Sequence, residues 1–218
     1  MDLKSWQEIP IQECGEPLVS LTNSPLSKIQ LIPFYYYRGI TGALNHILCR
    51  ESVYEKLRTA ANHLPENHSL LIWDAWRPYA VQQYLYDEFK NTIKRLNPIG
   101  NVNDLGSQFV SIPSIDVNKP SPHFTGGSVD LTILDKSGKP LEMGTAFDHF
   151  GDESNTQFFS DNISSQGLLI HQNRKLLLDI MVESGFQNYD MEWWHFDYGN
   201  QFWGAKTGEI AKYGLINF

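Results

Sequence analysis

The stretch SPHFTGGSVDLTIL, at residues 121–134, joins a histidine-containing loop to a strand that carries an aspartate. Polar and apolar residues alternate from Ser128 to Leu134, which predicts a strand with Asp130 on its polar face and the other face in the core. The glycine pair at 126–127 lets the chain turn sharply before this strand, so that His123 in the loop can face the same point as Asp130. An unpaired carboxylate on an otherwise apolar strand is costly, and a cation would be a suitable partner for it.

A second stretch, MEWWHFDY at residues 191–198, has the aromatic character of a strand and supplies Glu192 and His195. Residues three apart point to opposite faces of a regular strand, but the two need not both bind a metal, so a bend between them is tolerable. Two histidines, one aspartate and a further carboxylate are the groups of a catalytic zinc site, in which three ligands leave a position open for water. The pattern favours a zinc peptidase. The alternative is that the tryptophans fill the core and the two polar residues flank them by chance.

The elements around these stretches are read from periodicity and from proline and glycine positions. Three helices and one further strand are predicted, at Glu51–Leu64, Tyr79–Leu96, Gly167–Ser184 and, for the strand, Ser69–Trp76. Arg77 follows this strand directly, at a position where functional residues are common. By itself Arg77 is equally compatible with a surface salt bridge.

Three segments are less regular. PFYYYRGITG, from Pro33 to Gly42, is interpreted as the edge of a core strand, with the aromatic wall of a substrate cleft as the alternative. Asn97–Pro120 is predicted to be a long loop at the rim of a cleft, and Leu141–Asn162 is predicted to be a second polar loop.

Composition restricts the classes of protein to which the chain can belong. The 218 residues contain no internal repeat or linker, so one domain over residues 1–218 is expected. The net charge of −8 and the lack of a basic run argue against nucleic acid as a partner. The first residues lack the apolar core of a signal peptide, and no stretch approaches the roughly 20 apolar residues of a membrane helix. We therefore expect a cytoplasmic protein with no membrane partner, in which Cys14 and Cys49 are free, buried thiols.

The quoted motifs resemble those of a known family. SPHFTGGSVDLT and EWWH are similar to the paired SxHxxGxAxD and ExWH motifs of the D-Ala-D-Ala dipeptidases of peptidase family M15, which include the zinc enzymes of vancomycin resistance. WDAWRP, MGTAFD and NRKLLLDIMVESGF match in the same order. The resemblance implies a single α+β domain in which helices flank a central antiparallel sheet and a zinc site lies in a cleft.

The resemblance also implies roles for individual residues. His123, Asp130 and His195 match the ligands of one zinc ion per chain. Glu192 matches the general base, which takes a proton from the zinc-bound water and passes it to the leaving amine. Arg77 matches the arginine that supports the oxyanion of the tetrahedral intermediate, a role that a guanidinium beside zinc can fill on physical grounds.

Substrate-binding residues follow from the same resemblance. Asp148 of MGTAFD matches the carboxylate that holds the free α-amino group of the dipeptide, and Ser121 matches a serine that helps at the same end. The family's N-terminal tyrosine contact could be Tyr35, Tyr36 or Tyr37, because the first 40 residues match poorly.

The sequence departs from the family pattern at three positions near the site. Ser128 replaces the usual alanine, a change between two small side chains. Pro122 stiffens the loop before His123 and restricts Ser121 to extended geometry. Phe196 stands where a tyrosine is expected, which removes one hydroxyl.

The resemblance implies hydrolysis of D-Ala-D-Ala to two D-alanines, with a small dipeptide as the partner. One alternative is a D,D- or L,D-carboxypeptidase that acts on longer peptidoglycan peptides. Another is a non-catalytic zinc-binding module of the same fold, against which the presence of Glu192 and Arg77 argues. Oligomeric state and physiological role, whether antibiotic resistance, cell-wall recycling or nutrient use, do not follow from the sequence.

Overall fold

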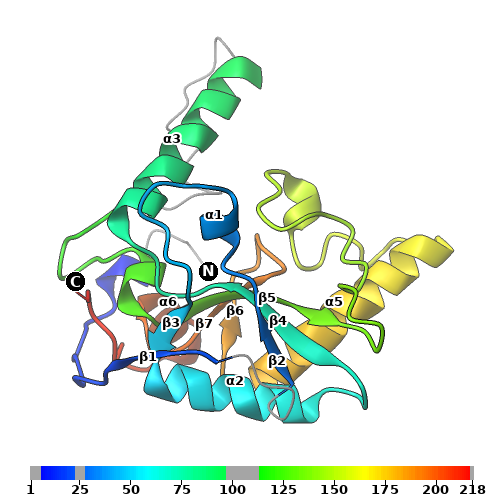
Figure 1. The fold of residues 1–218 in the computed structure, drawn as a ribbon, viewed down its shortest axis with the longest axis horizontal. Helices are drawn as coiled ribbons and strands as arrows, with labels where there is room; N and C mark the ends of the chain where they lie inside the picture. Colours follow the sequence, from blue (N-terminus) through cyan, green and yellow to red (C-terminus); the bar gives the residue numbers. More distant parts are fainter. Residues whose placement is uncertain (1–5, 23–27, 97–112, 217–218) are drawn as a thin grey trace.

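A five-stranded sheet forms the centre of the computed structural model, which describes residues 6–22, 28–96 and 113–216 (Figure 1). The strands lie in the order β2–β4–β5–β7–β6. They are β2 (Ile29–Leu31), β4 (Ser69–Asp74), β5 (Ser128–Leu134), β7 (His195–Asp197) and β6 (Gln187–Asn188). All pairings are antiparallel except the pairing of edge strand β2 with β4, which is parallel. The α+β class is confirmed, with a sheet that is mixed at this one edge.

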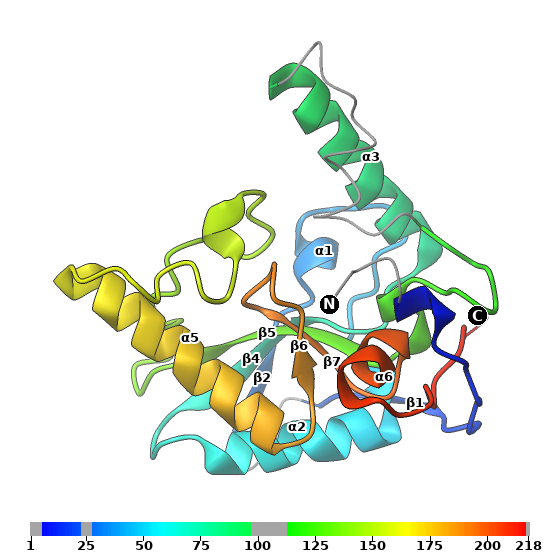
Figure 2. The ribbon, with the colours of Figure 1, turned by 180° about the vertical axis from the view of Figure 1, so that it is seen from behind.

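Helices and short strands surround the sheet. The helical elements are η1 (Trp6–Glu8), α1 (Phe34–Tyr37), α2 (Glu51–His63), α3 (Tyr79–Leu96), η3 (Pro122–Thr125), η4 (Asp152–Ser154), α5 (Ser165–Glu183) and α6 (Gln201–Thr207). Strands β1 (Leu18–Ser20) and β3 (Leu48–Arg50) form a separate antiparallel pair. Figures 1 and 2 show α2 and α5 on one side of the central sheet and α1 on the other, with α3 projecting away from the rest of the ribbon. None of the helices in the described ranges is long and apolar enough to cross a membrane.

The long helices form where their apolar stripes predict them. Val53 and Leu57 of α2 and Leu177 of α5 belong to the same buried cluster as Val129 and Leu131 of β5. At the start of α5 the hydroxyl of Ser164 accepts a hydrogen bond from the amide of Gly167, which is an N-cap. Gly185 follows α5 with a positive φ of 93°, the left-handed conformation in which a glycine commonly ends a helix.

Several predictions about the irregular segments need correction. The predicted strand edge at Pro33–Gly42 is wrong, because Phe34–Tyr37 forms a short helix after Pro33. The strand-like MEWWHFDY is a strand only over His195–Asp197 and a turn before it. Residues 97–112 of the predicted loop lie outside the described residues, and 113–120 contain no helix or strand. Both cysteines are free, but only Cys49 is buried.

Strand β5 differs from the prediction in that all seven of its residues are buried. One face packs toward α2 and α5. On the other face, Asp130 contacts Arg77, His123 of η3 and His195 of β7. In the register Asp130 pairs with His195 of β7, and Ser128 pairs with Asp197. On the other side Asp74 of β4 pairs with Asp130, after a β-bulge. The register therefore places a row of ionisable groups across three adjacent strands.

The loop between β5 and α5 is held by one buried arginine of α5. The guanidinium of Arg174, 1% exposed, donates hydrogen bonds to three main-chain carbonyls of this loop: Met143 at 2.7 Å, Asn155 at 2.6 Å and Glu153 at 2.8 Å. Burial lowers the pKa of Arg174 to about 10. Since the loop carries Asp148, Arg174 links the core helix to a predicted substrate-binding residue.

We predict that Arg174→Met lowers the free energy of unfolding by about 3 kcal/mol, because three buried carbonyls lose a charged donor. Urea denaturation followed by circular dichroism measures this change. Lys175→Met, on the exposed surface of the same helix, is the control and should change stability by less than about 0.5 kcal/mol. Equal stability of the two variants would show that Arg174 does not hold the loop.

Candidate metal centre

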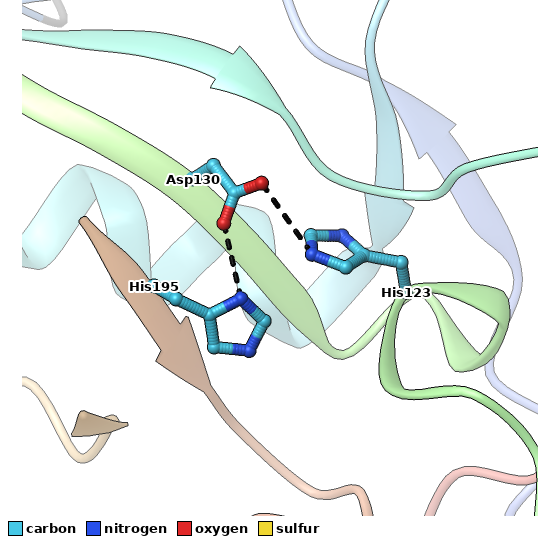
Figure 3. A group of neighbouring side chains, drawn as sticks. All are labelled: His123, Asp130 and His195. Carbon is cyan, nitrogen blue, oxygen red and sulfur yellow. Dashed lines mark hydrogen bonds and ion pairs between the residues drawn. The ribbon is translucent and has the colours of Figure 1, made fainter. Parts of the chain in front are cut away.

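His123, Asp130 and His195 lie together on the side of the sheet that carries Asp130 (Figure 3). Each offers one ligand atom, and these atoms lie within 4.8 Å of one another. Asp130 lies between the two rings, with Oδ1 at 3.0 Å from Nδ1 of His195 and Oδ2 at 3.4 Å from Nε2 of His123. All three side chains are buried. The structure therefore brings together the three predicted metal ligands.

The tight turn after η3 positions His123. Gly126 ends this turn with φ of 72°, in the left-handed region. A Cβ on Gly127 would lie 2.5 Å from the carbonyl oxygen of Tyr198, so the chain requires glycine there. The ring Nδ1 lies 2.6 Å from the carbonyl oxygen of Ala75, which can only accept a hydrogen bond. His123 therefore carries its proton on Nδ1 and presents the Nε2 lone pair to the site.

His195 presents the opposite nitrogen. Its Nε2 lies 3.1 Å from Oδ2 of Asp197, while Nδ1 faces Asp130. The two rings are 4.9 Å apart between centroids and nearly perpendicular, at 77°. Two imidazole nitrogens and one carboxylate oxygen thus converge, with the other nitrogen of each ring held by an oxygen acceptor. This donor set fits a divalent transition metal such as zinc.

A surplus of negative charge surrounds these ligands. Burial, reinforced by neighbouring carboxylates, raises the pKa of Glu192 to about 8, of Asp74 to about 7 and of Asp148 to about 6. Burial disfavours the charged form of His195, but Asp197 and Asp130 outweigh it and raise the pKa of His195 well above its ordinary value. For His123, burial and then Arg77 lower the pKa to about 3, so this ring stays neutral. Because the buried acids outnumber the buried bases, a bound cation would be favoured at this site.

Arg77 is the guanidinium at the centre of the site. Its Nε donates to Asp74 at 2.7 Å and one terminal nitrogen donates to Gln82 at 2.7 Å. The other terminal nitrogen lies 3.0 Å from Oδ2 of Asp130 and 3.3 Å from Nε2 of His123. Arg77 is 6% exposed, so the surface salt bridge considered as its alternative is excluded.

Glu192 lies in the turn that precedes β7. The amide of Asn188 clamps this turn, because its Nδ2 donates to the carbonyls of Glu192 at 3.0 Å and His195 at 2.9 Å. Oε2 of Glu192 lies 3.8 Å from Nδ1 of His195, close to the ligand atoms. The chain therefore bends between Glu192 and His195, as the three-residue spacing allows.

Asp148 faces the site from the loop after β5. The ring of Phe147 stacks on Trp73 at 4.6 Å between centroids, which brings this loop to the end of β4. Asp148 has a positive φ of 60°, a conformation that non-glycine residues rarely adopt. The hydroxyl of Tyr35 donates to Oδ1 at 3.2 Å, whereas Oδ2 is buried and has no hydrogen-bond partner within the described part of the chain. Arg38 approaches Oδ2 only to 3.9 Å.

The structure distinguishes among the three candidate tyrosines. Tyr35 is buried, and its hydroxyl links Asp148 to a terminal nitrogen of Arg77 at 3.3 Å. Tyr36 and Tyr37 are exposed by 47% and 73%. Ser121 is buried, and its hydroxyl accepts a hydrogen bond from the amide of Ser114 at 2.9 Å. Its part in substrate binding stays a prediction.

Comparison with known proteins agrees with this arrangement. The family model described as D-ala-D-ala dipeptidase, Peptidase M15, matches residues 34–212. The chain belongs to this family of peptidases. Among the relatives is a D-alanyl-D-alanine dipeptidase from Synechocystis sp., 30% identical over 240 aligned positions that cover 98% of this chain and 97% of the relative. Another, from Enterococcus faecalis, is 32% identical and covers 70% of this chain and 74% of the relative.

A solved structure also resembles the chain. It is the structure of the LdcB LD-carboxypeptidase, described as revealing the molecular basis of peptidoglycan recognition, with 18% identity and a TM-score of 0.42 over 92% of this chain and 77% of that one. A likeness this distant carries no argument about what this M15 peptidase does.

Sequence reasoning missed several residues of this M15 site. Asp197 holds His195 and is two positions after it on β7, so the period of a strand would have placed both side chains on one face. Asp74 and Gln82, which bind Arg77, come from a strand end and from α3. Asp74 could have been found as the acid of the WDAWRP motif, whereas no local signal marks Gln82.

We predict that Glu192 accounts for about 1 kcal/mol of the stability that the metal-free M15 peptidase loses between about pH 7 and pH 9. The folded state holds a proton on Glu192 up to about pH 8, against an ordinary value of 4.5. A group with a raised folded-state pKa stabilises the fold below that pKa, and this contribution is lost as pH rises through it. Urea denaturation in the presence of a chelator measures the change.

Glu192→Gln is the control for this pH dependence, because it keeps the shape of the side chain and removes the titration. The variant should lose about 1 kcal/mol less than the wild type between the same two pH values, and His195, whose pKa is also raised, contributes to the fall that remains. A fall as large as that of the wild type would assign the pH dependence to other groups, of which His195 is the foremost.

Proposed function

We propose that this M15 peptidase hydrolyses D-Ala-D-Ala to two D-alanines with one zinc ion per chain. The observation that carries the substrate assignment is the unpartnered oxygen Oδ2 of Asp148, buried beside Tyr35 and Arg77. A carboxylate in this state suits the free α-amino group of a dipeptide, since a charged hydrogen bond satisfies both partners. A peptide nitrogen, which is uncharged and has one N–H, would be a weaker hydrogen-bond donor to the Asp148 carboxylate.

His123, Asp130 and His195 would hold the zinc, through Nε2, a carboxylate oxygen and Nδ1 respectively. When bound, zinc polarises the scissile carbonyl and acidifies water. The donor set would also accept other divalent ions, so zinc is part of the proposal.

Glu192 moves the proton in this proposal. Its carboxylate takes a proton from the attacking water and delivers it to the amine that leaves. Burial raises the pKa of Glu192, and a carboxylate with a pKa near the working pH can both accept a proton and release it. The Asn188 clamp on the turn fixes the main chain around this base.

Arg77 supports the oxygen that becomes negative as water adds to the carbonyl. Its guanidinium is already oriented by Asp74 and Gln82, so little reorganisation is needed during the reaction. Tyr35 connects this oxyanion end to the amine end at Asp148. The length of substrate between the two ends would thereby be limited.

We predict that Glu192→Gln lowers kcat on D-Ala-D-Ala by about 10²–10⁴-fold, which is the usual contribution of general acid–base catalysis. The zinc content should be unchanged, because Glu192 is not among the proposed ligands. A coupled assay for released D-alanine, together with metal analysis, measures both. Full activity of this variant would remove Glu192 from the mechanism.

We also predict that Asp148→Asn lowers kcat/KM for the free dipeptide by about 100-fold, because a charged hydrogen bond to the amine contributes about 1.5–3 kcal/mol. N-acetyl-D-Ala-D-Ala should be a poor substrate for the wild type and should not be affected by the substitution. Asp161→Asn, an exposed acid on the same loop, is the control and should behave as the wild type.

The same two substrates decide between the alternatives. Cleavage of the blocked dipeptide as fast as the free one by the wild type would favour a carboxypeptidase. Tight zinc binding without cleavage of either would favour a non-catalytic zinc module.

A further inference from the structure

Asp197 is a buried carboxylate that the proposed mechanism does not use. It is 1% exposed and lies on β7, two residues after His195, with its side chain on the same face. The hydroxyl of Ser128 donates to Oδ1 at 2.7 Å, and Nδ2 of Asn200 donates to the same atom at 2.6 Å. Nε2 of His195 faces both oxygens of this carboxylate, at 3.2 Å from Oδ1 and 3.1 Å from Oδ2, and Oδ2 takes no part in the bonds from Ser128 and Asn200.

The ion pairs of the described residues include only one for Asp197, and its partner is His195. An isolated buried carboxylate is strongly destabilising, so its retention in the core requires this ring N–H or a comparable donor. Ser128 and Asn200 are themselves buried, which makes the orientation of the carboxylate rigid. Cross-strand register explains the arrangement, because Ser128 pairs with Asp197 in the row next to Asp130 and His195.

The hydrogen-bond roles in this network have a chemical consequence. A carboxylate accepts only, so Nε2 of His195 must carry a proton when it bonds Oδ2. Nδ1 faces a carboxylate oxygen of Asp130 as well, so a metal ion at the site would replace the proton on Nδ1 and the ring would keep its proton on Nε2. Nδ1, which faces Asp130, belongs to the same group of candidate ligand atoms as Nε2 of His123.

We propose that Asp197 is a positioning residue that holds His195 as the Nε2–H tautomer and directs Nδ1 toward the metal. This inference rests on the proposed metal site. It assigns to Ser128, which departs from the alanine of the family motif, the role of orienting the Asp197 carboxylate. Outer carboxylates of this kind fix the orientation of a ligand imidazole and increase its basicity.

The first test is the zinc affinity of Asp197→Asn, measured by competition with a chromophoric chelator. Ser128 and Asn200 would still require an acceptor at the position of Oδ1, so the new amide nitrogen would face Nε2 of His195. An amide N–H donor there favours a lone pair on Nε2 and a proton on Nδ1, which cannot then bind a metal. The expected result is a zinc affinity lower by about 10–100-fold.

Asp179→Asn is the matched control, since it makes the same change of charge on an exposed residue of α5. It should bind zinc as the wild type does. Unchanged affinity in a folded Asp197→Asn variant would overturn the role of Asp197 and leave the metal site intact. A wild-type protein that binds no zinc would overturn the metal site and this inference with it.

A second measurement needs no substitution. In the zinc-loaded wild type labelled with ¹⁵N-histidine, long-range ¹H–¹⁵N correlations report which nitrogen of His195 carries the proton. A proton on Nε2 with the metal on Nδ1 is expected. A proton on Nδ1 would overturn the proposal even if Asp197→Asn failed to fold.

Discussion

The pairing of Asp130 on β5 with His195 on β7 is the constraint on which the rest of the site depends. Antiparallel partners directly opposite each other bring their side chains close on one face of the sheet. This register places Oδ1 of Asp130 at 3.0 Å from Nδ1 of His195, and it also places Ser128 opposite Asp197. A shift of one residue would turn these polar groups into the apolar core beside α2 and α5. The hydrophobic pattern of β5 and the geometry of the site therefore specify the same register.

The second organising feature of the site is the group of charged side chains around the proposed metal ligands. Several acids are buried around one central guanidinium, that of Arg77, which contacts Asp74, Asp130 and Tyr35. Burial, reinforced by neighbouring carboxylates, raises the pKa of Glu192, whereas Asp197 and Asp130 raise that of His195 against burial, and burial keeps His123 neutral. Such a cluster is poorly balanced by protein groups alone, which is why a cation suits it. The core behind the sheet, with α2 and α5, supplies the rigidity that holds the acids together.

Much of the architecture could be predicted from local patterns. The stripes of α2 and α5, the alternation of β5 and the proline before α3 are properties of short windows, and those elements form as expected. The Phe34–Tyr37 helix and the turn at Glu192 were not predicted correctly, because aromatic runs suit either a strand or a helix and tertiary contacts decide between them. Asn188 fixes the turn at Glu192 through hydrogen bonds to its main chain. Its position seven residues before His195 gives no sign of that role.

The sequence by itself determined the residue types of the site and the family, because His123, Asp130, Glu192 and His195 stand in motifs whose spacing can be read directly. Only the tertiary structure decided which tyrosine meets Asp148, which nitrogen of each histidine faces the site, and that Asp197 holds His195. The physical reason is that a motif is a property of neighbouring residues. A hydrogen bond from Tyr35 to Asp148 joins residues 113 positions apart, and only the packing of the loop on Trp73 brings them together.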